Sequence, residues 1–168
     1  RYLDRGLSGT AGDLAAAVAE TGVAGAEVLE VGGGAGTIQV DLLRRGAASA
    51  VNVELSPGWE GAAAELLAES GVTERVERRL GDFVVLAATL DCADVVVLHR
   101  VVCCYPDWAA MLEAVAGLAR RVVAVTFPVD RWWARLGIGA GNLLTGATKC
   151  RFRGFVHPAA AMLRLLGD

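Results

Sequence analysis

The chain has 168 residues, of which 54% are hydrophobic, and a formal net charge of −3 at pH 7. This length suits one compact domain, 1–168, with a buried sheet, and is too short for two ordinary domains. The acidic balance argues against a nucleic-acid partner, because such partners are usually met by a basic face.

Helices and strands are expected to alternate along most of the chain. The first helix is indicated by an alanine-rich stretch with Leu14 and Val18 at helical spacing and Gly22 as its stop. Similar patterns predict strands over 27–31, 50–54, 76–80, 94–98 and 121–127, and helices over 10–21, 37–45, 59–70 and 108–118. Such alternation predicts a Rossmann-like, doubly wound α/β fold, with a mostly parallel sheet and helices on both faces.

A glycine-rich turn directly follows the first predicted strand. Its pattern is E-x-G-x-G-x-G, with Glu30 before Gly32, Gly34 and Gly36. A dinucleotide fingerprint would need glycine at the sixth position counted from Gly32, where Thr37 stands instead. Glycines here allow a sharp turn and let a ligand approach the backbone amides at a helix N-terminus. The turn is therefore expected to hold a small molecule.

Two further acids are expected at the same edge of the sheet. Glu54 ends the second predicted strand, where a carboxylate can accept hydrogen bonds from both hydroxyls of a ribose. Such an acid is also expected of NAD-binding proteins. It therefore supports a cofactor that contains adenosine, but it does not distinguish NAD from another cofactor of this kind. Asp82 follows the third strand and could equally be a turn residue or a helix cap. Ligands of parallel sheets gather at these carboxyl ends.

Taken in order, these motifs resemble those of the class I S-adenosylmethionine-dependent methyltransferases. The resemblance implies S-adenosylmethionine as the cofactor and a glycine loop that wraps its methionine portion. It also implies that the residue after Glu54 borders the adenine, and that the Asp82 region meets the adenine edge. The cofactor-binding residues expected on this basis are Glu30, Gly32, Gly33, Gly34, Gly36, Glu54, Leu55, Asp82, Phe83, Leu98 and His99.

Other segments resemble a subgroup of small bacterial methyltransferases that are similar to magnesium-protoporphyrin O-methyltransferase. These segments are 99–107, Phe127-Pro128 and Trp132-Trp133. Enzymes of the class end in a reversed hairpin of strands, for which the present sequence leaves few residues. The C-terminal hairpin of the usual seven-stranded sheet is therefore expected to be missing.

The segment after the fourth strand should face the methyl acceptor. It lacks the Asp/Asn-Pro-Pro-Tyr/Phe motif of amino-group enzymes and the Pro-Cys nucleophile of cytosine enzymes, since its order is Cys104-Tyr105-Pro106. His99 is the candidate base, or else a residue that merely lines the cofactor. Tyr105 is a candidate for orienting the acceptor, with packing at a helix start as the alternative. Arg100 could hold a substrate carboxylate or lie at the surface.

The segment 130–155 is apolar but broken by glycines, and it is a candidate lid or interface. A lid over an apolar or aromatic substrate, a homodimer surface, a patch resting on lipid, and a helix pair packed on the sheet all fit this composition. His157, which precedes a proline, is expected to cap a helix or pack against a lid rather than to act in catalysis.

The predicted function is S-adenosylmethionine-dependent methyl transfer to a small, apolar or aromatic molecule by in-line displacement. One alternative is a non-catalytic cofactor-binding subunit that stabilises a partner through 130–155. The other is an NAD-dependent oxidoreductase, which the glycine spacing and the lack of a Tyr-x-x-x-Lys pair disfavour.

The cysteines and the hydropathy complete these expectations. Cys92, Cys103, Cys104 and Cys150 show no C-x-x-C spacing, and no histidine spacing offers a zinc site with them, so no metal is expected. Free, mostly buried thiols are expected, with the adjacent pair reduced rather than joined as a vicinal disulfide. No run of about 18 apolar residues predicts a membrane span, and no export signal is present, so a cytoplasmic location is expected.

Overall fold

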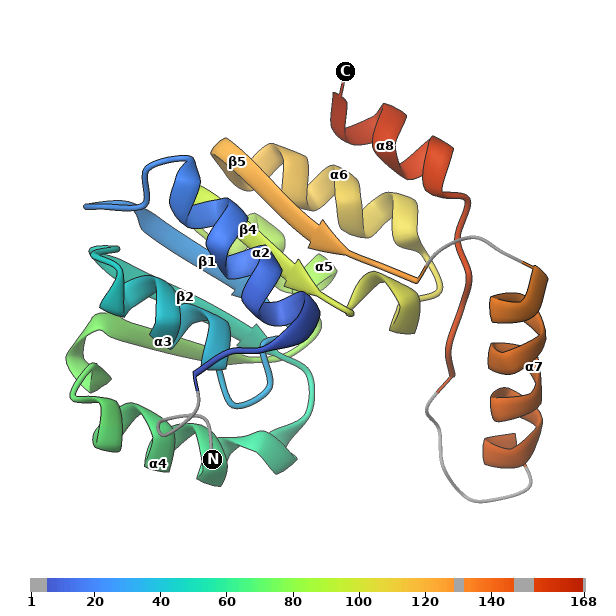
Figure 1. The fold of residues 1–168 in the computed structure, drawn as a ribbon, viewed down its shortest axis with the longest axis horizontal. Coiled ribbons are helices and arrows are strands. Elements are labelled where there is room, and N and C mark those ends of the chain that lie inside the picture. The colour runs from blue at the N-terminus through green and yellow to red at the C-terminus, as the bar shows by residue number, and fades with distance from the viewer. Residues whose placement is uncertain (1–5, 129–131, 147–152, 168) are drawn as a thin grey trace.

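The computed structural model describes residues 6–128, 132–146 and 153–167, and its centre is a sheet of five parallel strands (Figure 1). The strands are β1 (Glu27–Val31), β2 (Ser49–Glu54), β3 (Val76–Leu80), β4 (Ala93–His99) and β5 (Ala119–Thr126). They lie in the order β3-β2-β1-β4-β5, and each neighbouring pair is parallel. The predicted Rossmann-like α/β fold is confirmed.

Helices cover both faces of the sheet. They are α2 (Gly9–Glu20), α3 (Thr37–Arg44), α4 (Glu60–Ser70), α5 (Phe83–Leu86), α6 (Trp108–Leu118), α7 (Trp132–Gly146) and α8 (Ala159–Gly167). Short 3₁₀ turns lie between them: η1 (Pro57–Trp59), η2 (Thr73–Arg75), η3 (Ala87–Thr89) and η4 (Val102–Cys104). Residues of α2, α3 and α4 pack into one apolar cluster, and residues of α5, α6 and α8 pack into a second.

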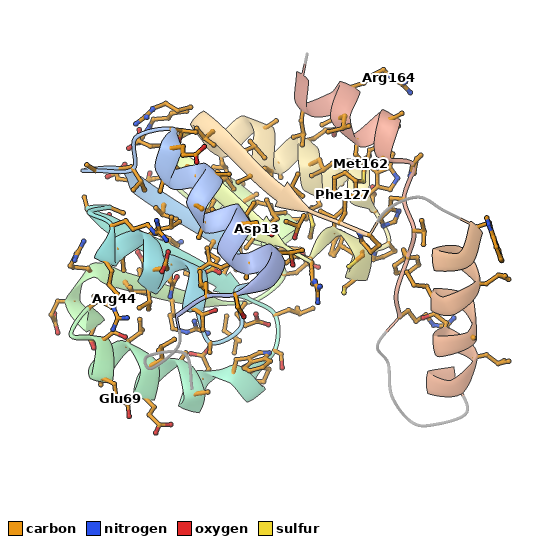
Figure 2. The ribbon with its side chains drawn as sticks, in the orientation of Figure 1. Asp13, Arg44, Glu69, Phe127, Met162 and Arg164 are labelled. Carbon is orange, nitrogen blue, oxygen red and sulfur yellow. The ribbon has the colours of Figure 1, made fainter. Side chains whose placement is uncertain are left out.

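The second cluster shows how the chain returns to the sheet near its C-terminal end. Met162 of α8 is 1% exposed and belongs to this cluster, against which Phe127 also packs. Figure 2 shows Met162 on the side of α8 nearest α6, while Arg164 points away from the protein. An apolar face inward and a charged face outward is the arrangement expected of a helix that covers a sheet.

The predicted bounds agree closely with the observed elements. The strands 27–31 and 76–80 and the helix 108–118 have the predicted bounds. The predicted helix 59–70 instead divides into η1 and α4, because the Ser56 hydroxyl accepts a hydrogen bond from the Gly58 amide at 3.3 Å and Pro57 opens a separate turn. The predicted strand 121–127 begins two residues earlier, where Ala119 pairs with Ala93.

The candidate lid or interface segment contains one described helix, α7, which stands apart from the sheet in Figure 1. The interpretation as a helix pair packed on the sheet is therefore wrong for the part of 130–155 that the structure describes. The Asn142 side chain instead bonds to the backbone of Gly154, accepting from its amide at 2.8 Å and donating to its carbonyl at 2.7 Å. The side chain of Trp133 lies outside the described residues.

The described chain after β5 forms α7 and α8 and adds no further strand to the sheet. None of the described helices has both the length and the apolar character needed to cross a bilayer.

Candidate functional site

Two adjoining cavities open at the carboxyl ends of the central strands. The larger, of about 780 Å³, is lined in part by Glu54, Leu55, Asp82, Phe83, Arg100 and Tyr105. The smaller, of about 340 Å³, lies over the glycine loop and reaches His99. Gly32 and Trp59 line both cavities. Most of the sequence-predicted residues therefore meet at one edge of the sheet, where parallel α/β folds bind ligands, whereas Gly36 and Leu98 line neither cavity.

The glycine loop joins β1 to α3 and is closed by its own backbone. The Gly32 amide donates to the Val53 carbonyl at 2.7 Å, and the Gly36 amide donates to the Gly33 carbonyl at 2.8 Å. Gly34 has a φ of +57°, and a Cβ there would lie 3.4 Å from the Trp59 ring. A side chain at this position would meet both an unfavourable backbone region and an aromatic neighbour.

Glu54 connects this loop to the end of β2. Its carboxylate accepts a hydrogen bond from the Gly34 amide at 2.8 Å and another from the Ser56 amide at 2.8 Å. The side chain is only 7% exposed, and it also lines the larger cavity. Each carboxylate oxygen has a second acceptor position. Glu54 can therefore hold the loop and still accept hydrogen bonds from a ligand.

A buried polar cluster supports the loop from below. Glu30 is 2% exposed, and its carboxyl accepts hydrogen bonds from the backbone amide of Gln39 at 3.1 Å and from Asn52 Nδ2 at 3.4 Å. Arg78 reaches from β3 to donate to the Gly34 carbonyl at 3.1 Å and to Glu60 at 2.7 Å. Sequence reasoning missed these contacts of Asn52 and Arg78, because nothing local marks a strand residue that reaches a loop across the sheet.

The burial of Glu30 has a consequence for stability at different pH values. Burial raises the pKa of Glu30 from 4.5 to about 8, although the Gln39 amide and the nearby Arg78 oppose this shift. The unfolded chain releases this proton near pH 4.5, whereas the folded chain retains it until about pH 8. The free energy of unfolding should therefore fall as pH rises across this window, by up to about 1.4 kcal/mol per pH unit.

We expect Glu30→Gln to remove most of this fall, because the amide cannot ionise. Urea unfolding of the wild type and the variant at pH 5 and pH 8 measures the difference. The matched control is Glu65→Gln on the exposed face of α4, which should follow the wild-type pH dependence. A wild-type fall that persists in Glu30→Gln would contradict the assignment to this carboxyl.

Asp82 and Tyr105 meet at the far end of the larger cavity. Asp82 caps α5 by accepting from the Val84 amide at 2.9 Å, so the helix-cap interpretation of this residue is confirmed. The Tyr105 hydroxyl donates to the same carboxylate, 3.2 Å from each oxygen. Burial and the Asp82 charge raise the pKa of Tyr105, which keeps the phenol protonated as the donor. Tyr105 thus lies beside the acid expected at the adenine edge.

The three apolar or aromatic residues expected at the cofactor have different surroundings. Leu55 is 65% exposed and lines the larger cavity, and Phe83 lines the same cavity although it is 4% exposed. Leu98 is fully buried in the second apolar cluster and lines neither cavity. Because the Leu98 side chain faces the core, the expected contact of Leu98 with the cofactor would have to come from its backbone, and it stays a prediction.

His99 ends β4 at the smaller cavity. Its Nδ1 lies 2.8 Å from the Thr126 hydroxyl, in register across to β5. Partial burial, and then the charge of Arg100, lower the pKa of His99 below 6.5, so its imidazole is neutral near pH 7. Thr126 was not among the expected site residues, although its position at the end of the neighbouring strand could have indicated it.

The segment after β4 differs from expectation. Cys92 and Cys104 are exposed and Cys103 is partly exposed, so the prediction of mostly buried thiols is wrong for these three; Cys150 lies outside the described residues. His157 Nε2 donates to the Val102 and Tyr105 carbonyls at 3.1 and 3.0 Å, which agrees with a packing role rather than catalysis. Among the described residues, no three histidines, cysteines or acids gather as metal ligands.

A family model matches the part of the chain that contains this site. A model described as "Methyltransferase domain" matches residues 28–122, which is more than half of the chain. This range runs from β1 into β5 and includes the glycine loop, Glu54, Asp82 and His99. No curated protein sequence is significantly similar to the chain.

Solved structures share the fold at low sequence identity. Magnesium protoporphyrin IX methyltransferase from Synechocystis PCC 6803, with bound SAH, matches with a TM-score of 0.71 and 24% identity, over 95% of this chain and 70% of that one. An O-methyltransferase family protein from Burkholderia thailandensis matches with a TM-score of 0.70 and 24% identity, over 94% of this chain and 50% of that one. The present chain thus spans half to about two thirds of the length of these structures.

Proposed function

This chain belongs to the class I S-adenosylmethionine-dependent methyltransferases, and we propose that it methylates a small, apolar or aromatic acceptor at the two adjoining cavities. The observation that carries the proposal is the meeting of the glycine loop, Glu54 and Asp82 around cavities that share Gly32 and Trp59. S-adenosylmethionine supplies a methyl group on a positively charged sulfur, which is already activated for transfer.

The residues of the site fit this cofactor. Gly34, which lacks the Cβ that would approach Trp59, leaves the loop open to a ligand at the smaller cavity. In the proposal, the loop amides hold the methionine portion, Glu54 accepts from the ribose hydroxyls, and Asp82 accepts from the adenine edge. Leu55 and Phe83 border the base from the walls of the larger cavity. Glu30 lines the smaller cavity although it is 2% exposed, so in the proposal it both keeps the loop in place and borders the cofactor.

Two arginines suggest how an acceptor is held. Arg100 and Arg153 both line the larger cavity, and neither forms a salt bridge with another residue that the structure describes. Since the two acids in that wall already accept hydrogen bonds from the protein, these cations can receive an acidic group of the acceptor. An apolar or aromatic molecule that carries a carboxylate fits this wall best.

An acceptor that reacts through its carboxylate does not need a general base from the protein. A carboxylate is already deprotonated near pH 7, so the protein would need only to align it with the methyl donor. A phenol or hydroxyl would need a base, and in the proposal the neutral imidazole of His99, which lines the smaller cavity, accepts that proton. His99 therefore remains the proposed base for acceptors that must lose a proton.

Calorimetric titration with S-adenosylhomocysteine, with NAD as the parallel ligand, tests the cofactor part of this proposal. We expect heat from the first ligand alone. Binding of NAD alone would contradict the proposal and favour the oxidoreductase. Binding of neither ligand to the folded protein would contradict it as well and favour a subunit that stabilises a partner.

The acceptor part is tested by methyl transfer from labelled S-adenosylmethionine to aromatic and tetrapyrrole carboxylic acids and to their esters. We expect the acids alone to react. Arg100→Gln should raise KM for a reactive acid by about 10- to 100-fold, the range for losing a hydrogen bond to a charged group. Arg100 has a left-handed backbone conformation, with a φ of +59°, which is unfavourable for any side chain with a Cβ. Glutamine also has a Cβ, so this substitution should not change the energy of the backbone. An unaltered KM would remove Arg100 from the acceptor site.

The exposed face of α7 extends this proposal to the segment 130–155. Trp132, Leu136 and Leu143 are 74%, 64% and 78% exposed and recur at the spacing of one helix face. We propose that this face covers a bound acceptor as a lid. Light scattering at increasing protein concentration distinguishes the lid from a homodimer contact, because only the contact predicts a concentration-dependent mass.

A further inference from the structure

The two adjacent cysteines of η4 have their sulfur atoms side by side. Cys103 Sγ and Cys104 Sγ are 3.7 Å apart, and each lies near the Arg100 carbonyl, at 3.3 and 3.6 Å. Cys104 also lines the larger cavity. Neighbouring residues of a helical turn normally direct their side chains apart. The two partly exposed thiols therefore lie close enough beside the cavity to bind one ligand together.

The backbone before η4 arranges this pair. Arg100 has a φ of +59°, a left-handed conformation that is uncommon for any residue except glycine. Its amide donates to the Thr126 hydroxyl at 3.1 Å and to the Thr126 carbonyl at 3.2 Å, which fixes the turn at the end of β4. The carbonyl of the same residue faces both thiols. The sulfur positions are thus held by the fold.

Hydrogen bonds from the segment before α8 also fix the Cys103 carbonyl and the turn that follows it. The Phe155 amide donates to the Cys103 carbonyl at 2.6 Å, and His157 Nε2 donates to the carbonyls on either side of the pair. The bond from the Cys104 thiol, with the charge of Arg100, lowers the pKa of Cys103 to about 7, whereas the pKa of Cys104 is raised. One of the two sulfurs is therefore ready to act as a nucleophile near neutral pH.

The separation of the sulfurs favours a bridge of one atom over a direct disulfide. A disulfide needs sulfurs about 2.05 Å apart and Cα atoms usually about 4.4 to 6.8 Å apart. Adjacent Cα atoms lie only about 3.8 Å apart across a trans peptide, which is below this range, so a direct disulfide between the two residues would be strained. With two bonds of about 2.3 Å to one bridging atom, the observed 3.7 Å gives a bond angle of about 107° at that atom.

This angle suits a bridging atom with bent bonds to the two sulfurs. A linear two-coordinate ion would need the sulfurs about 4.6 Å apart, twice the bond length. A tetrahedral zinc site would need further protein ligands, and the described residues offer no group of three. A pyramidal trivalent arsenic centre needs only two thiolates, since it carries its third substituent itself.

We propose that Cys103 and Cys104 form a dithiol site that binds trivalent arsenicals at the edge of the larger cavity. With an arsenic oxide of the form R–As=O, two As–S bonds form and the bonds between arsenic and oxygen break. The oxygen leaves as water with the two thiol protons. Arsenic remains trivalent, and no oxidant is required. The proposal does not rest on the methyl acceptor proposed above, although Cys104 and Arg100 line the same cavity.

The probe for this site is phenylarsine oxide, and the readout is native mass spectrometry. We expect one equivalent to bind to the full chain, to resist excess mercaptoethanol, and to be removed by 2,3-dimercaptopropanol. Cys103→Ser and Cys104→Ser should each weaken binding by at least about 100-fold, because the second As–S bond is intramolecular only when both thiols are present.

Matched controls are Cys92→Ser and Cys150→Ser, which should bind like the wild type. Cys92 is exposed and its thiol lies by Gly117, at the opposite end of β4 from the pair. A wild-type adduct that mercaptoethanol removes would overturn the proposal, whether or not the serine variants fold. So would an adduct that is retained in either folded variant of the pair or lost in either control.

Discussion

Glu54→Ala is expected to weaken S-adenosylhomocysteine binding by about 1 to 3 kcal/mol, a loss of roughly 5- to 150-fold in affinity. The carboxylate is 7% exposed and already accepts from the Gly34 and Ser56 amides. Alanine removes the acceptor proposed for the ribose hydroxyls. It also leaves two backbone donors without this partner, so the glycine loop loses its connection to β2. Calorimetric titration measures both the affinity and the heat of binding.

Two further variants separate these contributions. Glu54→Gln keeps one oxygen acceptor but loses the charge, so we expect an affinity between those of the wild type and Glu54→Ala. Glu65→Ala makes the same change as Glu54→Ala on the exposed face of α4 and should bind like the wild type. If folded Glu54→Ala bound the ligand with unchanged affinity, Glu54 would not belong to the cofactor site.

The elements that the sequence predicts best are those with local start and stop signals. The helix 108–118 begins where Asp107 caps it, by accepting from the Ala110 amide at 3.0 Å, and it has the predicted bounds. The glycine loop is equally visible, because its pattern is contiguous. Glu54 and Asp82 could be placed at the same edge, since each follows a predicted strand of a parallel sheet.

The contacts that the sequence does not predict join residues that are far apart in the chain. Arg78 reaches the Gly34 carbonyl, and Tyr105 reaches Asp82, only because the crossovers bring these distant segments together. Cys103 and Cys104 read as ordinary apolar residues until the left-handed turn at Arg100 brings their thiols toward one carbonyl. An arginine gives no local signal for such a turn, because left-handed backbone outside glycine is found mainly at asparagine, aspartate and histidine.

These long-range contacts also divide the polar residues of the site into two groups. Glu54 and Asp82 line the larger cavity and can meet a ligand directly. Gln39 and Asn52 are fully buried and support the loop from below. A change in the second group should act on cofactor binding through the shape of the loop. Gly36 lies against the Gln39 side chain, so a substitution at Gly36 tests this effect.

Gly36→Ala is expected to lower the free energy of unfolding by about 2 to 5 kcal/mol and to weaken cofactor binding. Gly36 has a φ of +86°, and left-handed backbone costs an alanine about 1 to 2 kcal/mol. The added Cβ would also lie 2.3 Å from Gln39 Nε2, in a fully buried side chain that cannot move into solvent. Such overpacking costs about 1 to 3 kcal/mol. Urea unfolding and titration with S-adenosylhomocysteine measure the two effects.

The matched control is Gly61→Ala, because a Cβ at this exposed position of α4 meets nothing within 4 Å. Alanine should stabilise that helix by up to about 1 kcal/mol and leave cofactor binding unchanged. In the double variant Gly36→Ala/Gln39→Ala the clash is absent, whereas the left-handed backbone remains. The difference in the free energy of unfolding between the double variant and Gln39→Ala should therefore be only the cost of the left-handed backbone, about 1 to 2 kcal/mol. An equally large loss in both backgrounds would assign the whole effect to the backbone and none to Gln39.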